Sequence, residues 1–204
     1  MICFDAVSGL EFLHTEQNLM HRDVKPSNIL ASRDGRVVIC DFGIAGKLVN
    51  SHAMTVIGCK PYMAPERINP KKDSEGYGVR SDVWSLGITV YELATGKYPY
   101  SKWKNQFQQM EEVVDGVPPH LPPPTEDPTY TIDVVDFVAK CLNKSVDSRP
   151  KYQDLLNHAF LKKYSGHGRE EIAQFFQEVL DAENTPRGAP EAAKHNTLQP
   201  QTTA

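Results

Sequence analysis

Apolar residues recur at helical spacing along much of this chain of 204 residues. Near the N-terminus, Cys3, Val7, Leu10 and His14 follow one another at steps of four, three and four, which places them on one face of a helix. This spacing predicts a helix over residues 2–14.

The pattern then changes to two short apolar runs, residues 28–30 and 37–40, joined by a stretch that contains Arg33, Asp34 and Gly35. A polar turn with an Asp-Gly pair between two apolar runs is typical of a β-hairpin. The sequence therefore predicts a small hairpin in the first quarter of the chain.

The stretch DVWSLGITVYELAT, residues 82–95, is apolar almost all round. A helix of that composition is normally central to a hydrophobic core, and the glycine that follows, Gly96, suits a C-terminal cap. We expect the core to form around Trp84, Leu86, Ile88 and Leu93.

Four more helices are predicted where apolar residues keep helical spacing. They cover residues 103–114, 132–142, 152–161 and 169–183. The proline-rich residues 116–128 are predicted to form a loop. Residues 184–204 are rich in Pro, Thr, Gln, Ala and Asn, and we expect them to be a disordered tail.

Composition favours a soluble globular protein, with 40% hydrophobic and 24% charged residues. The net charge of -4 argues against a nucleic-acid or membrane-surface partner, and no apolar run approaches the roughly 18 residues of a membrane helix. The cysteines are widely spaced and form no C-x-x-C pair, so we expect reduced thiols in a cytoplasmic or nuclear protein. They are Cys3, Cys40, Cys59 and Cys141.

Two neighbouring segments carry the residue types that phosphoryl transfer requires, HRDVKPSNIL at residues 21–30 and the CDFG that follows it. Asp23 can accept or orient the proton of an acceptor hydroxyl. Lys25 can neutralise a moving phosphate as a point charge. The side-chain oxygens of Asn28 and Asp41 suit the hard cation Mg²⁺.

The order and spacing of HRD (residues 21–23), DFG (41–43) and APE (64–66) resemble the protein-kinase signature. The later DVWSLG (82–87) and Arg149 extend the resemblance. It implies a mainly α fold, the helical C-terminal lobe of a kinase, with a small β hairpin that carries the catalytic and DFG loops. It also implies that ATP and Mg²⁺ are the cofactors.

The same resemblance gives the motif residues their roles. Asp23 and Lys25 would be catalytic, and Lys25 would also contact the nucleotide. Asn28 and Asp41 would bind the metal and the nucleotide, and Leu30 would lie under the adenine ring while also packing in the hairpin. A lysine two positions after the aspartate is typical of kinases of the serine/threonine type.

The segment SHAMT, followed by GCKPYMAPERINP at residues 58–70, resembles the activation segment of MAP kinase kinases of the stress-activated branch. This implies a dual-specificity enzyme that phosphorylates Thr and Tyr of a MAP kinase. Ser51 and Thr55 would be phosphorylated by an upstream kinase, and the added phosphates would pair with Arg22 and order the loop. Met54 departs from the pattern, because family members usually have lysine there.

Three further residues resemble scaffold positions of the kinase family. Glu66 and Arg149 resemble a buried ion pair that fixes the end of the activation segment. Asp82 resembles the aspartate at a helix start that holds the backbone of the catalytic loop.

The last predicted helix, residues 169–183, resembles the region through which MAP kinase kinases bind their upstream kinase. Its apolar spacing suits a helix that docks in a groove, although packing on its own domain explains the spacing equally well. The predicted division of the chain is a kinase C-lobe over residues 1–163, a docking helix over 164–183 and a tail over 184–204.

The 204 residues contain no counterpart of the glycine-rich loop, strand lysine and partner glutamate of a kinase N-lobe. Two hypotheses of different classes follow. In the first, the chain is a partial kinase domain of a MAP kinase kinase, which the intact Asp23, Asn28 and Asp41 favour. In the second, it is a catalytically inactive C-lobe that docks or scaffolds an upstream kinase or a MAP kinase.

Overall fold

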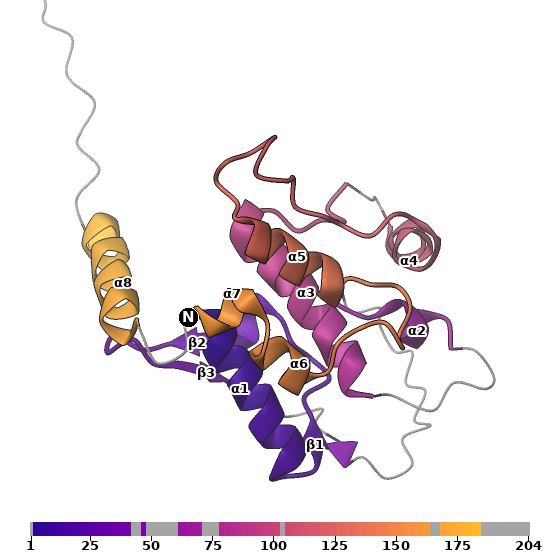
Figure 1. Ribbon diagram of the computed structural model, residues 1–204, viewed down its shortest axis with the longest axis horizontal. Helices are drawn as coiled ribbons and strands as arrows, with labels where there is room; N and C mark the ends of the chain where they lie inside the picture. The colour runs from indigo at the N-terminus through magenta and orange to yellow at the C-terminus, as the bar shows by residue number, and fades with distance from the viewer. Residues whose placement is uncertain are drawn as a thin grey trace, which may run out of the picture.

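The computed structural model describes residues 2–41, 46–47, 61–70, 78–102, 105–163 and 168–184. Helices dominate these residues, and Figure 1 shows them arranged around the long helix α3 (Val79–Thr95). Two pairs of short antiparallel strands accompany the helices. The mainly helical composition with a small sheet agrees with the fold class expected from the sequence.

The N-terminal part begins with a helix and continues with four very short strands. Its elements are α1 (Ile2–Thr15), β1 (Leu19–Met20), a 3-10 turn (Pro26–Asn28), β2 (Ile29–Ala31), β3 (Val37–Ile39) and β4 (Gly46–Lys47). Strands β2 and β3 form the predicted hairpin, and Leu30 pairs with Val38 in its register. The pairing of β1 with β4 was not predicted, because two-residue strands leave no periodicity to detect.

In the C-terminal part, all regular secondary structure among the described residues is helical. It contains α2 (Pro65–Ile68), α3, α4 (Gln106–Asp115), α5 (Ile132–Cys141), α6 (Tyr152–Leu156), α7 (Ala159–Lys162) and α8 (Arg169–Asn184). The proline-rich stretch between α4 and α5 is a loop, as expected. No helix in the described part of the chain is long and apolar enough to cross a membrane.

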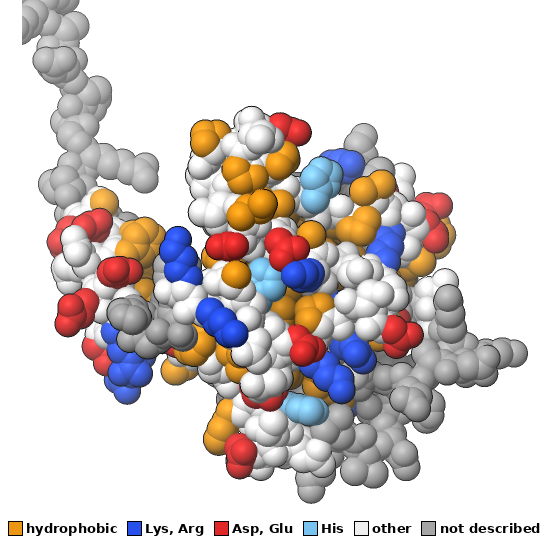
Figure 2. All heavy atoms as spheres, in the orientation of Figure 1, with side chains coloured by type: hydrophobic (Ala, Val, Ile, Leu, Met, Phe, Trp, Pro, Cys, Tyr) orange, Lys and Arg blue, Asp and Glu red, His pale blue; other side chains and the backbone are white. Residues whose placement is uncertain are grey.

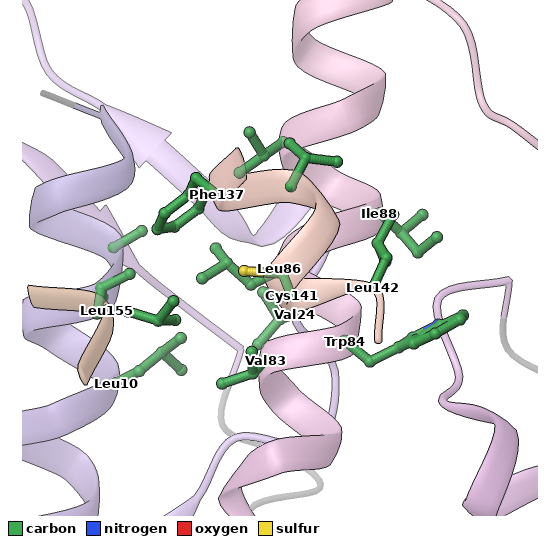
Figure 3. Packing of buried hydrophobic residues seen from close by; sticks show 14 of the residues in the cluster. Leu10, Val24, Val83, Trp84, Leu86, Ile88, Phe137, Cys141, Leu142 and Leu155 are labelled. Carbon is green, nitrogen blue, oxygen red and sulfur yellow. The ribbon is translucent and has the colours of Figure 1, made fainter. Parts of the chain in front are cut away.

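The core forms where α3 meets α1 and α5, and Figure 3 shows its side chains from close by. Trp84, Leu86 and Ile88 of α3 are each at most 1% exposed, as the sequence predicted. Leu93 contradicts the prediction, because it is 51% exposed. The next residue, Ala94, is also exposed, so this side of the last turn of α3 faces solvent despite its apolar pattern.

Close contact between α3 and α5 depends on Gly87. A Cβ atom at this position would lie 2.7 Å from Cβ of Cys141 and 2.8 Å from Cδ2 of Leu142. Gly96 ends α3 in the left-handed conformation, with φ of 67°, and its N–H donates to the carbonyl of Glu92. This is the C-terminal cap that the sequence predicted.

One predicted helix is wrong in its extent. Residues 152–161 were expected to form a single helix, but they form α6 and α7 with Asn157 and His158 between them. His158 has extended backbone, and its ring nitrogen Nδ1 accepts a hydrogen bond from the N–H of Phe160 at 3.2 Å. This side-chain cap starts a new helix where apolar spacing alone suggested continuation.

Candidate active site

The catalytic loop that follows β1 is anchored on the core through Asp82, which lies in the first turn of α3. Asp82 is fully buried, and its two carboxylate oxygens accept from the backbone N–H groups of His21 and Arg22, each at 2.9 Å. The hydroxyl of Tyr152 in α6 donates to the same carboxylate at 3.1 Å. The role predicted for Asp82 is confirmed, whereas nothing in the sequence pattern pointed to Tyr152.

His21 connects the catalytic loop to the segment that contains Asp41. Its Nδ1 accepts from the N–H of Asp23 at 3.3 Å, so the ring proton is assigned to Nε2, which donates to the carbonyl of Cys40 at 3.0 Å. The N–H of Cys40 donates in turn to the carbonyl of Asn28 at 2.9 Å. These bonds hold the two motif segments side by side.

Asp23, the predicted catalytic residue, is 9% exposed and lies in a cluster of polar side chains. Its Oδ2 accepts from Nζ of Lys25 at 3.0 Å and from Nδ2 of Asn28 at 3.3 Å. Asn28 also donates from Nδ2 to the Asp23 backbone carbonyl at 2.8 Å. The three residues that the sequence placed in one motif are therefore in direct contact.

The donor set at Asn28 and Asp41 fits a magnesium ion. Because Nδ2 of Asn28 donates to two oxygens of Asp23, Oδ1 is directed away from Asp23, and the hydroxyl of Ser27 donates to it at 3.5 Å. Asp41 is exposed, and it directly follows Cys40, which is hydrogen-bonded to Asn28. Among the described residues, no group of three or more His, Cys, Asp and Glu side chains could hold a metal by itself.

Two residues of this region adopt backbone conformations that L-amino acids rarely use. Arg22 has φ of 68° and Asp41 has φ of 65°. Such strain, of order 1–3 kcal/mol per residue, persists only where surrounding contacts enforce it, and it concentrates at functional sites. Arg22 directly precedes Asp23, so both strained residues belong to the predicted site.

Leu30 and Val38 are a cross-strand pair that lies on the outer face of the hairpin. Leu30 and Val38 are 49% and 53% exposed. Ile39 lies on the other face of the hairpin and faces Gly9 of α1, where an added Cβ atom would lie at ordinary contact distance from the Ile39 side chain. The exposed position of Leu30 is compatible with the predicted adenine contact. Leu30 is not part of the buried core.

Glu66 and Arg149 form the predicted ion pair. It is bidentate, with Nη1 of Arg149 donating to Oε1 of Glu66 at 2.9 Å and Nη2 donating to Oε2 at 3.0 Å. Ser81 donates to Oε1 of Glu66 at 2.7 Å. Burial tends to raise the pKa of Glu66, but the hydrogen bonds and charge of Arg149 outweigh it and hold this pKa below its ordinary value.

Arg149 also binds backbone carbonyls and an aromatic ring. Its Nε donates to the carbonyl of Asn143 at 2.9 Å, and Nη1 donates to the carbonyl of Arg80 at 2.7 Å. Its guanidinium lies 5.3 Å from the ring centroid of Trp84. Through these contacts the fully buried Arg149 connects α2, α3 and the loop after α5.

A shallow hollow lies beside Asp23. Arg22, Val24, Tyr62, Met63, Arg67 and Ser85 line it together with Asp23. Ser85 donates to the carbonyl of Tyr62 at 2.7 Å, and the Tyr62 hydroxyl donates to Glu92 at 2.6 Å. Burial and the neighbouring Glu92 raise the pKa of Tyr62 above its ordinary value.

The remaining predictions fall partly outside the described residues. Ser51 and Thr55, and the tail apart from Asn184, lie outside them. Arg22, their predicted phosphate-binding partner, is among the described residues and is half-buried. Cys3, Cys40 and Cys141 are free thiols, and burial raises the pKa of Cys3 to about 11.

The apolar residues of α8 do not share one environment. Ile172 is 8% exposed, whereas Phe175 and Val179 are 55% and 38% exposed. Figure 2 shows acidic side chains gathered over this helix, at the left of the molecule. The helix is therefore attached at one end and presents apolar and acidic groups at the surface.

Comparison with known proteins places these features in a family. The family described as "Protein kinase domain" matches residues 1–161. The chain is 48% identical to the "Dual specificity mitogen-activated protein kinase kinase sek-1" of Caenorhabditis elegans over 181 residues, which is 88% of this chain and 53% of that protein.

Two further relatives are similar over slightly different lengths. The "MAP kinase kinase mkk-4" of Caenorhabditis elegans is 47% identical over 184 residues, 88% of this chain and 50% of its own. The "Protein kinase wis1" of Schizosaccharomyces pombe is 46% identical over 166 residues, 79% of this chain and 27% of its own. The chain thus spans about half the length of the two worm relatives.

Proposed function

The chain belongs to the protein kinase family, and we propose that it functions as a dual-specificity MAP kinase kinase. This enzyme transfers the γ-phosphate of ATP to Thr and Tyr in the activation loop of a MAP kinase, within a stress-signalling cascade. The observation that carries the proposal is the contact of Asp23 with both Lys25 and Asn28, beside Asp41. The similarity to kinases named as MAP kinase kinases supports the choice of substrate.

In this proposal each residue of the cluster has a separate task. Asp23 orients the acceptor hydroxyl and takes its proton, from a position that the bonds of Lys25 and Asn28 to Oδ2 fix. Lys25 lies 3.0 Å from that carboxylate and brings the positive charge that a transferring phosphoryl group requires. Asn28 and Asp41 hold Mg²⁺, which supplies charge neutralisation for the phosphates. Leu30 packs under the adenine ring.

Activation would act through the segment before the APE motif. We propose that an upstream kinase phosphorylates Ser51 and Thr55 and that the phosphates pair with Arg22. A phosphate brings nearly two negative charges, and an arginine is its natural bidentate partner. Arg22 lines the hollow beside Asp23, so a phosphate bound to Arg22 would lie next to the residue that orients the acceptor hydroxyl.

Upstream and downstream kinases are the proposed partners. Over Arg169–Asn184, α8 carries exposed Phe175 and Val179 together with five acidic side chains. These groups suit a partner groove with an apolar floor and a basic rim. We propose that the upstream kinase docks there and that the MAP kinase is the substrate.

The first test is the binding of ATP–Mg²⁺ to the polypeptide of residues 1–204 by calorimetry. We expect binding to be weakened in Asp41→Asn, which removes the charge and still tolerates a positive φ, and unchanged in Asp133→Asn on α5. Micromolar binding that Asp41→Asn weakens supports the nucleotide site in this polypeptide. Equal binding in wild type and Asp41→Asn contradicts the assignment of Asp41.

A second test addresses transfer itself. We expect negligible turnover for residues 1–204 alone, because the sequence lacks a glycine-rich loop and a strand lysine. We expect activity when the same residues are joined to a kinase N-lobe of the family. In that protein Asp23→Asn abolishes phosphorylation of both Thr and Tyr, and full activity of this variant would overturn the role of Asp23.

A docking function without phosphoryl transfer is the second candidate. The exposed apolar residues Phe175 and Val179 on an acidic helix favour it. Residues 1–204 that bind a kinase partner but not ATP–Mg²⁺ support this function for the polypeptide. Loss of partner binding in Phe175→Asp would locate the contact on α8.

A further inference from the structure

The tip of the β2–β3 hairpin contains one residue whose burial is unexpected. Gly35 is buried, although its neighbours Asp34 and Arg36 are exposed and form a surface ion pair with side chains more than half accessible. Hairpin tips normally face solvent. Another part of the molecule must therefore cover this glycine.

The covering group is the backbone of Arg169, the first residue of α8. A Cβ atom added at Gly35 would overlap the carbonyl oxygen of Arg169 and would lie 2.7 Å from its carbonyl carbon and 3.0 Å from its Cα. Gly35 also has φ of 78°, so its conformation alone favours glycine. The absence of a side chain at Gly35 is thus what allows α8 to sit on the turn.

Further contacts of α8 are concentrated at the same end. Burial raises the pKa of Asp5 in α1, and the charge of Arg169 is close enough to oppose this shift. Ile172 is buried, while Phe175 and Val179 further along are exposed. Figure 1 shows the first turn of α8 beside β2 and β3 and the rest of the helix directed away from the other helices.

The hairpin connects this contact to the candidate active site over a short distance. β2 begins directly after Asn28, and β3 is followed by Cys40 and Asp41. A three-residue strand spans only about 10 Å. The turn itself is held by two backbone hydrogen bonds. The N–H of Ser32 donates to the carbonyl of Arg36 at 2.8 Å, and the N–H of Gly35 donates to the carbonyl of Ser32 at 2.9 Å.

We propose that α8 is a removable brace for this hairpin, seated on Gly35 through the backbone of Arg169. With α8 in place, the hairpin holds Asn28 and Asp41 in a fixed relation. A partner that draws α8 away loosens the hairpin and so disturbs the two candidate metal ligands. The consequence for magnesium rests on the proposed kinase function, but the brace itself does not.

The outer face of the hairpin explains why a brace matters there. α1 supports only the inner face, through Ile39, while Leu30 and Val38 on the outer face are about half exposed. Short strands with one supported face are marginally stable by themselves. A contact at the tip therefore adds support to that of α1 in keeping the strands paired, and by linkage a ligand that orders the hairpin strengthens the seating of α8.

Hydrogen exchange of residues 1–204, measured without nucleotide, tests the seat first. In Gly35→Ala we expect amides of α8 to exchange about tenfold faster, because the added methyl group displaces Arg169. Gly96→Ala is the matched control, since Gly96 also has positive φ but a Cβ there meets nothing within 4 Å. Equal exchange of α8 in the two variants would overturn the proposal.

A second pair of variants tests the brace without altering the hairpin. Ile172→Asp is expected to release α8 and to raise exchange of the β2 and β3 amides several-fold, whereas Val179→Asp, with the same charge on the same helix, leaves both unchanged. If Ile172→Asp releases α8 and the strand amides are unaffected, or if α8 is not released at all, the brace does not exist. Because no nucleotide is present, failure of the kinase function would not alter either result.

Discussion

The catalytic loop and the helix α8 are attached to the same lobe in opposite ways. The loop is held by a fully buried carboxylate, Asp82, which accepts two backbone N–H groups and a tyrosine hydroxyl. The helix α8 is held by one buried side chain, Ile172, and by a backbone contact at Gly35.

The two attachments differ in the free energy needed to separate each segment from the rest of the lobe. Removing the loop from Asp82 would take two hydrogen-bond donors away from a fully buried carboxylate, which is a large penalty. Moving α8 from its seat exposes one isoleucine and a glycine, and burial of a single isoleucine contributes about 1.5–3 kcal/mol. The loop therefore belongs to a fixed part of the structure, and α8 is suited to a contact that forms and breaks.

The largest effect is expected where the fixed part contains a buried charge. Arg149→Met leaves Glu66 without its bidentate partner and the carbonyls of Asn143 and Arg80 without their donor, so we expect a loss of about 3–5 kcal/mol in unfolding free energy. Urea denaturation measures it. The double variant Glu66→Leu with Arg149→Met is expected to be more stable than Arg149→Met alone, because no stranded carboxylate remains.

The loop anchor itself is expected to give the next largest effect. Asp82→Asn keeps the size of the side chain but turns an amide N–H₂ toward donors, and we expect a loss of about 2–3 kcal/mol. Amide exchange at His21 and Arg22 should rise with it, while α8 stays protected. Faster exchange at α8 than at the loop would contradict the separation of the two regions, and Asp133→Asn serves as the control.

Packing inside the fixed part can be compared with packing at its edge by two equivalent glycine substitutions. Gly87→Ala brings a methyl group against Cys141 and Leu142, and we expect a loss of about 1–3 kcal/mol from overpacking. Gly9→Ala adds its methyl group at an ordinary 3.7 Å from Ile39, so the gain in helix propensity should make it neutral or stabilising. Thermal unfolding of both variants measures the contrast.

Acid is expected to weaken the fixed part with a smaller and more gradual effect. The folded-state pKa of Glu66 lies below the ordinary value of a glutamate, so its contribution to stability is complete above that ordinary value and is lost as the pH falls further. Unfolding free energy measured from pH 6 downward should therefore decline below about 4.5. Glu66→Gln should show a shallower decline, and an equal slope would contradict the assignment.

Local pattern predicted most of the helices and the hairpin correctly, because their faces are set by neighbouring residues. It failed where a side chain made a specific cap, as His158 does between α6 and α7, and where an apolar side chain of a helix faces solvent, as at Leu93. The pairing of β1 with β4 joins residues 26 or more positions apart, and two-residue strands carry no signal of it.

The candidate site was likewise only partly predictable from the sequence. The motif positions of Asp23, Lys25, Asn28 and Asp41 were evident in the sequence, as was the pairing of Glu66 with Arg149 by resemblance. Their partners Tyr152, Ser81 and Arg80 were not evident, because a single hydroxyl or carbonyl leaves no periodic trace.

The sequence by itself determined which chemical groups the candidate site contains, because the carboxylates, the amide and the lysine stand at fixed spacing along the chain. It also determined the helical character of the lobe. Only the tertiary structure decided how those groups are held, through a carboxylate on α3 and a histidine that bonds to Cys40. It alone placed α8 on Gly35, since contacts between residues more than 130 positions apart depend on how the whole chain packs.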